Sequence, residues 1–329
     1  MSRPLNETGF HGTGRVIIDN EHFTLSMSEL HDEPSNSASP TDFDSASITA
    51  TSGGYSCHTC EMSEARCGDH TIYYEVFGEG PRLLFFNGSG ATIESTRLLL
   101  NVLAQHFTVA VHDQRGLGKS SCPQGPYTMA DYATDGRAVL DAVGWSSCRV
   151  VGISFGGMVA QEFAVTWPHK VERLVLMCTS AGGPLGSSYP LHTLADLDAD
   201  ERASRSMQLM DSRFNAEWLA AHPSDRALVT DAARRAALPK SAEQVRGERE
   251  QLLARSFHDV SDRLSRIYSP TLVACGRFDG IAPPENSARI AETIPHAQLK
   301  TYEGGHMFMV QDHAAFPDMF AFLLSDAET

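Results

Sequence analysis

The stretch that most constrains this chain is a serine held between two glycines. Ser154 lies at the centre of the pentapeptide from Gly152 to Gly156, which follows an apolar run typical of a short strand and precedes a run typical of a helix. A strand that becomes a helix within one residue forces the serine into a strained backbone conformation, and the glycines remove side chains that would clash there. The hydroxyl then stands above the sheet, beside the N–H groups that begin the helix. The pattern predicts a nucleophilic serine whose oxyanion the N–H of Phe155 would stabilise.

A serine nucleophile requires a base and an acid, and candidates for both follow it along the chain. The apolar run 273–278 reads as a strand that ends at Asp279, and the run 299–305 reads as a strand that ends at His306. Serine, acid and histidine, each just after a strand, is the order that one known architecture uses. Without these partners the pentapeptide would indicate only a close-packed turn, since so short a pattern also arises by chance.

In these motifs and their order, the chain resembles the α/β-hydrolases that carry a helical lid, over about residues 62–329. The resemblance implies an α/β fold in which helices flank a mostly parallel central sheet and a helical lid is inserted. It also implies three roles: Ser154 attacks a carbonyl carbon, His306 accepts the serine proton, and Asp279 orients the imidazole. Serine at this turn separates the chain from dehalogenase and epoxide-hydrolase relatives, which carry an aspartate there.

The strand predicted at 82–86 ends in the loop 87–90, Asn-Gly-Ser-Gly, where many relatives carry a His-Gly pair. In those relatives the residue after the pair supplies the second oxyanion N–H, which by position is Ser89 here. Asn87 departs from the common pattern, but the donor is a backbone amide. We therefore expect the N–H groups of Ser89 and Phe155 to form the oxyanion hole. The alternative is a merely flexible turn. The Asn-bearing loop resembles that of enol-lactonases.

The next predicted strand leads into the loop His112–Ser120, which resembles a D-x-R-G-x-G-x-S loop common in this family. Asp113 and Arg115 are interpreted as loop scaffolding. His112 is interpreted as a structural histidine, because a catalytic histidine is supplied later in the chain. The pair His258-Asp259 has acid–base character, but nothing in the sequence places it near the nucleophile, so we expect it also to be structural.

About ninety residues between the strand predicted at 174–178 and Thr271 contain no convincing strand. Their composition, rich in Ala, Arg, Leu and Glu, favours helices. We expect four helices, at 196–210, 215–221, 224–237 and 242–255, and we interpret the segment of about 184–265 as the lid. The apolar residues of these helices are expected mostly to pack against the main domain rather than to contact substrate.

The first 61 residues differ from the rest of the chain. From Asp32 to Ser56 the sequence is mostly Ser, Thr, Ala, Asp, Gly and Pro without apolar periodicity. Such a composition does not bury enough surface to offset chain entropy. We expect residues 1–61 to be a disordered N-terminal extension and residues 62–329 to form the hydrolase domain.

A group of possible zinc ligands lies near the start of that domain: Cys57, Cys60, Cys67 and His70, with the spacing C-x2-C-x6-C-x2-H. Three thiolates and an imidazole could bind one zinc ion. However, no second half-site follows, and Gly68-Asp69 fits a two-residue hairpin turn between strands. We therefore expect a hairpin here and no metal site.

The composition argues against several classes of partner. A net charge of −15 is unfavourable for binding nucleic acid or anionic membranes, which require clustered Lys and Arg. No apolar run approaches the length of a membrane span or of a signal-peptide core, and seven scattered cysteines fit free thiols in a reducing compartment. We therefore expect a cytoplasmic enzyme that acts on a small molecule, without a metal or organic cofactor.

These roles predict hydrolysis of a carboxylic ester or lactone through an acyl-enzyme. The same triad could instead cleave a carbon–carbon bond beside a ketone or carry out cofactor-free perhydrolysis, and the sequence does not separate these reactions. From a different class, a chain with this fold could be a ligand receptor with slow turnover, in which closure of the lid matters most. The acyl group, the leaving group and the oligomeric state are left open.

Overall fold

The computed structural model describes residues 17–19, 22–24 and 63–325, and the structural statements below concern these residues. The chain divides into two compact units, Met1–Thr59 and Cys60–Thr329. In the first unit, strands β1 (Ile17–Asp19) and β2 (His22–Thr24) pair antiparallel. The remainder of residues 1–61, including the segment 32–56 expected to be disordered, lies outside the described residues.

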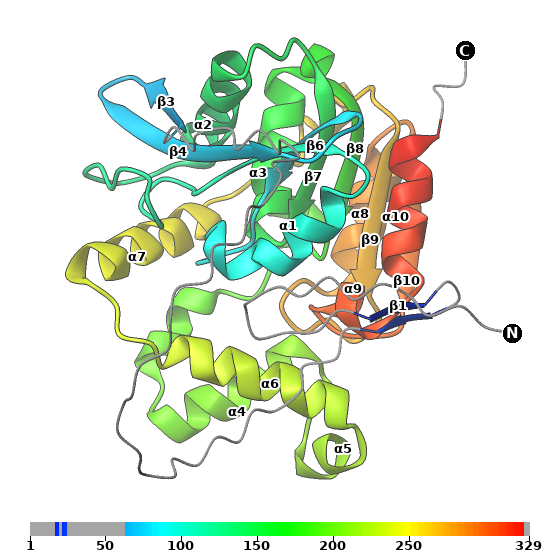
Figure 1. Cartoon of the computed structure of the whole chain (residues 1–329). Helices are drawn as coiled ribbons and strands as arrows, with labels where there is room; N and C mark the ends of the chain where they lie inside the picture. The colour runs from blue at the N-terminus through cyan, green and yellow to red at the C-terminus, as the bar shows by residue number, and fades with distance from the viewer. Residues whose placement is uncertain (1–16, 20–21, 25–62, 326–329) are drawn as a thin grey trace, which may run out of the picture. The chain divides into compact units, whose positions relative to one another are not determined.

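The second unit is built around one eight-stranded sheet (Figure 1). In chain order its strands are β3 (Ser63–Cys67), β4 (His70–Phe77), β5 (Arg82–Phe86), β6 (Thr108–His112), β7 (Cys148–Ile153), β8 (Val171–Met177), β9 (Thr271–Gly276) and β10 (Ala297–Tyr302). Their order across the sheet is β10-β9-β8-β7-β5-β6-β4-β3. Neighbours from β10 to β6 pair parallel, whereas β4 pairs antiparallel with both β6 and β3. The predicted α/β fold with a mostly parallel sheet is confirmed.

Helices flank this sheet: α1 (Arg97–Leu103), α2 (Met129–Ala142), α3 (Phe155–Thr166), α8 (Pro284–Thr293), α9 (Phe308–Gln311) and α10 (Ala315–Leu324). Short 3-10 turns connect elements at η1 (Glu94–Thr96), η2 (Pro168–Lys170), η3 (Gly183–Leu185), η4 (Leu191–Asp196) and η5 (Leu264–Arg266). No helix of the described residues is both long and apolar enough to cross a membrane.

Two hydrophobic cores cover the two faces of the sheet, because successive side chains of a strand point to opposite faces. In β5, Leu84 and Phe86 belong to the core that includes α2 and α3, whereas Leu83 and Phe85 belong to the core that includes α1 and α10. These four side chains are at most 1% exposed. Each contributes about 1.5–3 kcal/mol of hydrophobic stabilisation. Burial on both faces explains why the strand reads as a continuous apolar run.

The helix α2 begins and ends where the sequence predicts. The Thr128 hydroxyl accepts a hydrogen bond from the N–H of Asp131, and the Asp131 carboxylate accepts one from the N–H of Thr128. This reciprocal capping contributes about 1 kcal/mol. After the helix, Gly144 adopts a φ of 68°, a conformation that glycine permits at low cost.

The four helices predicted between β8 and β9 are all present: α4 (Ala199–Met210), α5 (Ala216–Ala221), α6 (Pro223–Ala236) and α7 (Ala242–Ser256). Figure 1 shows α4, α5 and α6 grouped away from the sheet. The first begins three residues later than expected, because Asp198 caps it by accepting hydrogen bonds from the N–H groups of Asp200 and Glu201. Between β8 and β9 the described chain has one isolated bridge, Gly182 with Asp259, and no strand.

The two glycines of the pentapeptide let α3 lie directly on the strands beneath it. A Cβ atom on Gly156 would stand 2.0 Å from the carbonyl oxygen of Phe86, and one on Gly152 would stand 2.3 Å from the carbonyl oxygen of Gly156. Both obstacles are backbone atoms that do not rotate away. Side chains at these positions would therefore push the helix off the sheet.

We predict that Gly156→Ala lowers the free energy of unfolding by about 3 kcal/mol, the upper end of the usual cost of overpacking, because the added methyl meets backbone. Gly88→Ala is the matched control, since its Cβ would find its nearest neighbour at 3.6 Å, an ordinary contact. Thermal and urea unfolding of both variants would measure the difference. Equal stabilities would contradict the close packing described here.

Candidate active site

Ser154 occupies a sharp turn between β7 and α3. Its φ is 55° and its ψ is −114°, and among the described residues only Cys178 shares a positive φ without being glycine. Such a conformation costs on the order of 1–3 kcal/mol and persists only where neighbours enforce it. Here the Ser154 N–H donates to the carbonyl oxygen of Met177, and the Thr179 hydroxyl donates to the carbonyl oxygen of Ser154, both at 2.8 Å. The strain predicted for this serine is present.

The structure brings Ser154, His306 and Asp279 together. The His306 Nε2 atom lies 2.8 Å from the Ser154 Oγ atom, and the His306 Nδ1 atom lies 2.8 Å from the Asp279 Oδ2 atom. The Asp279 side chain is fully buried, and its Oδ1 atom accepts hydrogen bonds from the N–H groups of Ile281 and Ala282. These bonds fix the carboxylate, so its second oxygen is aimed at the imidazole.

The loop that carries His306 is held by the end of α4. The His306 N–H donates to the carbonyl oxygen of Met210 at 2.6 Å, and a Cβ on Gly305 would stand 2.0 Å from that same oxygen. The Gln311 amide connects this loop to the residue after α4, because it accepts a hydrogen bond from the N–H of Gly305 and donates one to Asp211. Sequence reasoning missed Gln311 and Asp211, since neither lies in a recognisable motif.

The loop after β5 lies against the serine. An atom at the Cβ position of Gly88 would be 3.8 Å from the Ser154 Cβ atom. The N–H of Ser89 has no hydrogen-bond partner in the described part of the chain. Phe155 is the first residue of α3, so its N–H has no acceptor inside the helix. Neither N–H is engaged by the described part of the chain, so both are available for the oxyanion hole that the sequence predicts.

A chain of buried amides holds this loop in place, and it was not predicted. The Gly90 N–H donates to the Gln251 Oε1 atom at 2.7 Å, and Gln251 in turn donates to the Gln114 Oε1 atom at 3.0 Å. Gln114 donates to the carbonyl oxygen of Asn87 at 2.7 Å. Both glutamine side chains are buried. The lid helix α7, which carries Gln251, therefore fixes both ends of the loop.

The loop His112–Ser120 is scaffolding, as predicted. The Asp113 carboxylate accepts hydrogen bonds from the N–H groups of Ile93 at 2.7 Å and Lys119 at 2.9 Å, so it joins two loops. His112 is buried against the Phe86 ring, and burial lowers the pKa of its imidazole to about 4. A histidine held neutral in an apolar environment fits a structural role.

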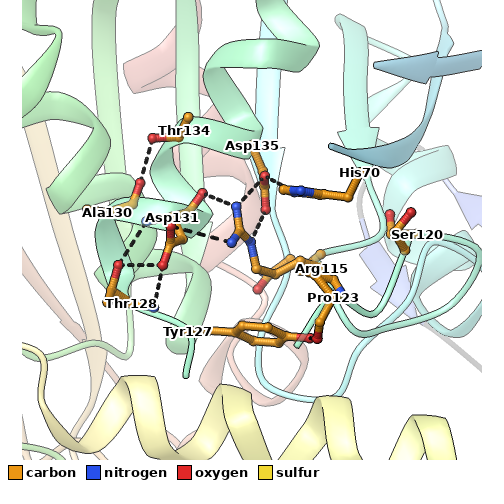
Figure 2. A network of polar contacts seen from close by, with 12 residues as sticks. His70, Arg115, Ser120, Pro123, Tyr127, Thr128, Ala130, Asp131, Thr134 and Asp135 are labelled. Carbon is orange, nitrogen blue, oxygen red and sulfur yellow. Dashed lines mark hydrogen bonds and ion pairs between the residues drawn. The ribbon is translucent and has the colours of Figure 1, made fainter. Parts of the chain in front are cut away.

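Figure 2 shows that Arg115 reaches across to α2. Its guanidinium donates two hydrogen bonds of 2.7 Å to the two carboxylate oxygens of Asp135, and one more to the carbonyl oxygen of Asp131. Asp135 is fully buried, and His70 approaches the same carboxylate at 3.4 Å. This bidentate ion pair ties the loop to the helix.

Two of the possible zinc ligands, Cys67 and His70, lie beside the ion pair of Arg115 and Asp135. Cys67 and His70 pair across the turn at Gly68-Asp69, which confirms the predicted hairpin, and their ligand atoms lie within 4.8 Å of Asp135. The guanidinium of Arg115 already occupies both Asp135 oxygens, and burial beside Asp135 raises the pKa of the Cys67 thiol to about 11. A buried cation and a protonated thiol do not fit a metal. Cys57 and Cys60 lie outside the described residues.

The two residues of the pair His258-Asp259 lie in different environments. His258 is buried, and burial lowers the pKa of its imidazole to about 4. Asp259 accepts from the hydroxyl and the N–H of Ser261 at the surface. The two side chains do not form a hydrogen-bonded pair with each other among the described contacts, which agrees with the structural interpretation of Asp259.

The fold and this geometry together define a class of protein, the α/β hydrolases. Comparison with protein families agrees, since residues 81–312 match the family described as alpha/beta hydrolase fold. The chain therefore belongs to that family and is an enzyme of the α/β-hydrolase type.

Three known proteins illustrate the likeness. The chain is 29% identical over 265 residues to a protein of Azorhizobium caulinodans provisionally named carbamate hydrolase RutD, covering 79% of this chain and 95% of the relative. It is 26% identical over 251 residues to 3-oxoadipate enol-lactonase 2 of Acinetobacter baylyi, covering 75% and 91%. A solved structure of a hydrolase from Pseudomonas aeruginosa matches with a TM-score of 0.66 and 28% identity, covering 81% of this chain and 100% of that chain. The resemblance to lid-bearing esterases and enol-lactonases is confirmed.

We predict that Arg115→Met lowers the free energy of unfolding by about 3–5 kcal/mol, because it leaves the Asp135 carboxylate buried without its partner. Arg137→Met removes an exposed ion pair with Asp141 on the same helix α2, and it should cost at most about 0.5 kcal/mol. Urea unfolding at neutral pH would measure both. A loss for Arg115→Met no larger than for the control would show that this ion pair is not structural.

Proposed function

We propose that this enzyme hydrolyses a carboxylic ester or lactone of a small molecule through an acyl-enzyme. The observation that carries the proposal is the unbroken series of contacts from Asp279 through His306 to Ser154, with both distances at 2.8 Å. In this arrangement the imidazole takes the serine proton while the serine oxygen attacks the carbonyl carbon. The carboxylate holds the imidazole in the tautomer whose Nε2 atom can accept that proton.

The oxyanion that forms on the carbonyl carbon requires donors already in place. The N–H groups of Ser89 and Phe155 serve this role in the proposal, and the positive end of the α3 dipole adds to it. The amide chain through Gln114 and Gln251 supports the proposal, because it holds the Ser89 loop without help from substrate. Water then attacks the acyl-enzyme, with the imidazole as base, and regenerates the serine.

The relatives favour hydrolysis at an acyl carbon. One is named as an enol-lactonase and another provisionally as a carbamate hydrolase, and both reactions begin with attack on a carbonyl next to oxygen or nitrogen. Cleavage of a carbon–carbon bond, perhydrolysis and a receptor role use the same residues and are the alternatives to this proposal. A cytoplasmic location is also proposed, because the described cysteines are free thiols, as expected in a reducing compartment.

We predict that Ser154→Ala reduces ester hydrolysis by about 10⁴-fold or more, because among the described residues no other hydroxyl forms a hydrogen bond with His306. A fluorophosphonate probe should label the wild-type protein at Ser154 alone. Ser204→Ala, an exposed serine on α4, is the control and should keep full activity and labelling. Retention of more than about a tenth of wild-type turnover in Ser154→Ala would refute the assignment of the nucleophile.

We predict that Asp279→Asn lowers kcat by about 10³–10⁴-fold with little change in melting temperature. The amide can still accept from the two N–H groups of Ile281 and Ala282, but it favours the wrong tautomer of His306. Asp259→Asn, at an exposed carboxylate of the lid, is the control. If Asp259→Asn is inactive and Asp279→Asn is not, then the acid has been misassigned.

A further inference from the structure

A cavity of about 250 Å³ lies between the lid and helix α3. Its wall includes Met158 from α3, Ser180 after β8, the segment 187–192, and Arg255 and His258 at the end of α7. The volume is about eight times the ~30 Å³ that one water molecule occupies in the liquid. It therefore has room for a small organic group rather than for water alone.

Two residues of the cavity wall lie one helical turn beyond residues of the candidate active site. Met158 follows Ser154 by four residues along α3, and Arg255 follows Gln251 by four residues along α7. Side chains four residues apart in a helix share a face. Because Gln251 binds the loop beside the serine, Arg255 lies on the face of α7 that is turned towards that loop. A substrate held at Ser154 could place its far end in this cavity.

Arg255 is unusual among the arginines of the described chain. Its side chain is buried, with 6% of the residue exposed, yet its Nε and Nη2 atoms have no hydrogen-bond partner. Other partly buried arginines are paired, as Arg263 is with Glu162 and Arg213 with Asp211. A buried cation without a hydrogen-bonded carboxylate is costly to the fold, since the lost solvation is not replaced by an ion pair.

Arg255 nevertheless remains charged. Burial lowers the pKa of its guanidinium to about 10, with the charge of Asp279 acting in the opposite direction. That value lies above neutral pH, so the guanidinium is positive in the folded protein. The fold therefore holds a positive charge that has no hydrogen-bonded partner at Nε and Nη2 at the wall of a cavity.

The remaining polar groups indicate which anion fits. A guanidinium presents a planar pair of N–H donors that matches a carboxylate. Ser180, whose Oγ atom accepts from the Asn286 amide at 3.0 Å, offers its hydroxyl hydrogen as a further donor. His258 is neutral near pH 7, because burial lowers its pKa to about 4. One full positive charge balances a carboxylate, whereas a phosphate dianion would keep an excess negative charge.

We propose that Arg255 binds a free carboxylate of the substrate in this cavity, so that the substrate is an ester or lactone of a small dicarboxylic acid. The inference rests on the proposed function, because it assigns the far end of a molecule whose acyl carbon is attacked by Ser154. Arg255 then acts in binding and specificity rather than in the bond-breaking step.

The test compares substrates that differ only in the anionic group. Monomethyl glutarate carries the carboxylate, and methyl 5-methylhexanoate replaces it with an isopropyl group of similar shape; monomethyl succinate and monomethyl adipate vary the reach. We expect kcat/KM to favour one of the three acids over its neutral analogue by about tenfold or more, and Arg255→Gln to reduce that ratio at least about tenfold. Arg249→Gln, an exposed arginine on the same helix, should leave the ratio unchanged. A preference that survives Arg255→Gln would overturn the proposal.

A binding measurement separates this inference from the proposed function. In the Ser154→Ala protein, glutarate or the preferred diacid should raise the melting temperature, and the added Arg255→Gln change should abolish the rise. Stabilisation without any ester or lactone hydrolysis by the wild type would keep the cavity assignment and reject the proposed reaction. Inorganic phosphate that stabilises as strongly as the diacid would overturn the choice of carboxylate.

A stability measurement guards against a purely structural role for Arg255. Without ligand, Arg255→Met should melt at the same temperature as the wild type or higher, because it removes a buried charge that forms no ion pair or hydrogen bond through Nε and Nη2. If Arg255→Gln does not fold, Arg255→Lys replaces it in the substrate comparison. An unchanged kcat/KM ratio in Arg255→Lys would overturn the proposed pair of hydrogen bonds from the guanidinium to the substrate carboxylate. A large loss of stability in Arg255→Met with an undiminished substrate preference would overturn the proposal as a whole.

Discussion

The structure depends on one backbone conformation, the positive φ of Ser154. That conformation is unfavourable by itself, so it exists only because neighbouring atoms leave no alternative. The carbonyl oxygen of Phe86 stands where a side chain on Gly156 would be, and hydrogen bonds from Ser154 to Met177 and from Thr179 to Ser154 fix both sides of its peptide. The packing of α3 on the sheet therefore positions a hydroxyl. The free energy gained by packing the core thus offsets the strain of the backbone that holds the Ser154 hydroxyl in place.

The chemistry-bearing residues could be predicted from sequence because each role is local. A serine between glycines, an acid after one strand and a histidine after another can each be recognised from a few neighbours. The strands themselves could be predicted because burial on both faces leaves continuous apolar runs. The helices of the lid were found from composition, and the start of α4 was misplaced by three residues because its cap, Asp198, was not recognised.

The residues that support the site could not be predicted, because their partners are far away in sequence. Gln251 lies 161 residues from Gly90 and 137 from Gln114, and nothing in a single sequence joins such positions. Arg255 looks like any other charged residue of a helix until the structure shows that its guanidinium is buried beside a cavity. For Cys67 and His70 the spacing alone allows a metal, but the turn residues between them predicted the hairpin that the structure shows. Long-range contacts and burial, rather than motifs, separate these cases.

The insertion between β8 and β9 is not an independent module. It supplies three hydrogen-bond acceptors to loops of the candidate active site: the carbonyl oxygen of Leu209 for the Gly280 N–H, that of Met210 for the His306 N–H, and the Gln251 amide for the Gly90 N–H. Two of these are backbone atoms, which tolerate exchange of their own side chains but not a change in chain length. The third depends on one amide side chain. A chimera that transplants this insertion from a relative would therefore inherit a working hydrolytic centre only if it preserved the position of the end of α4 and an amide at position 251.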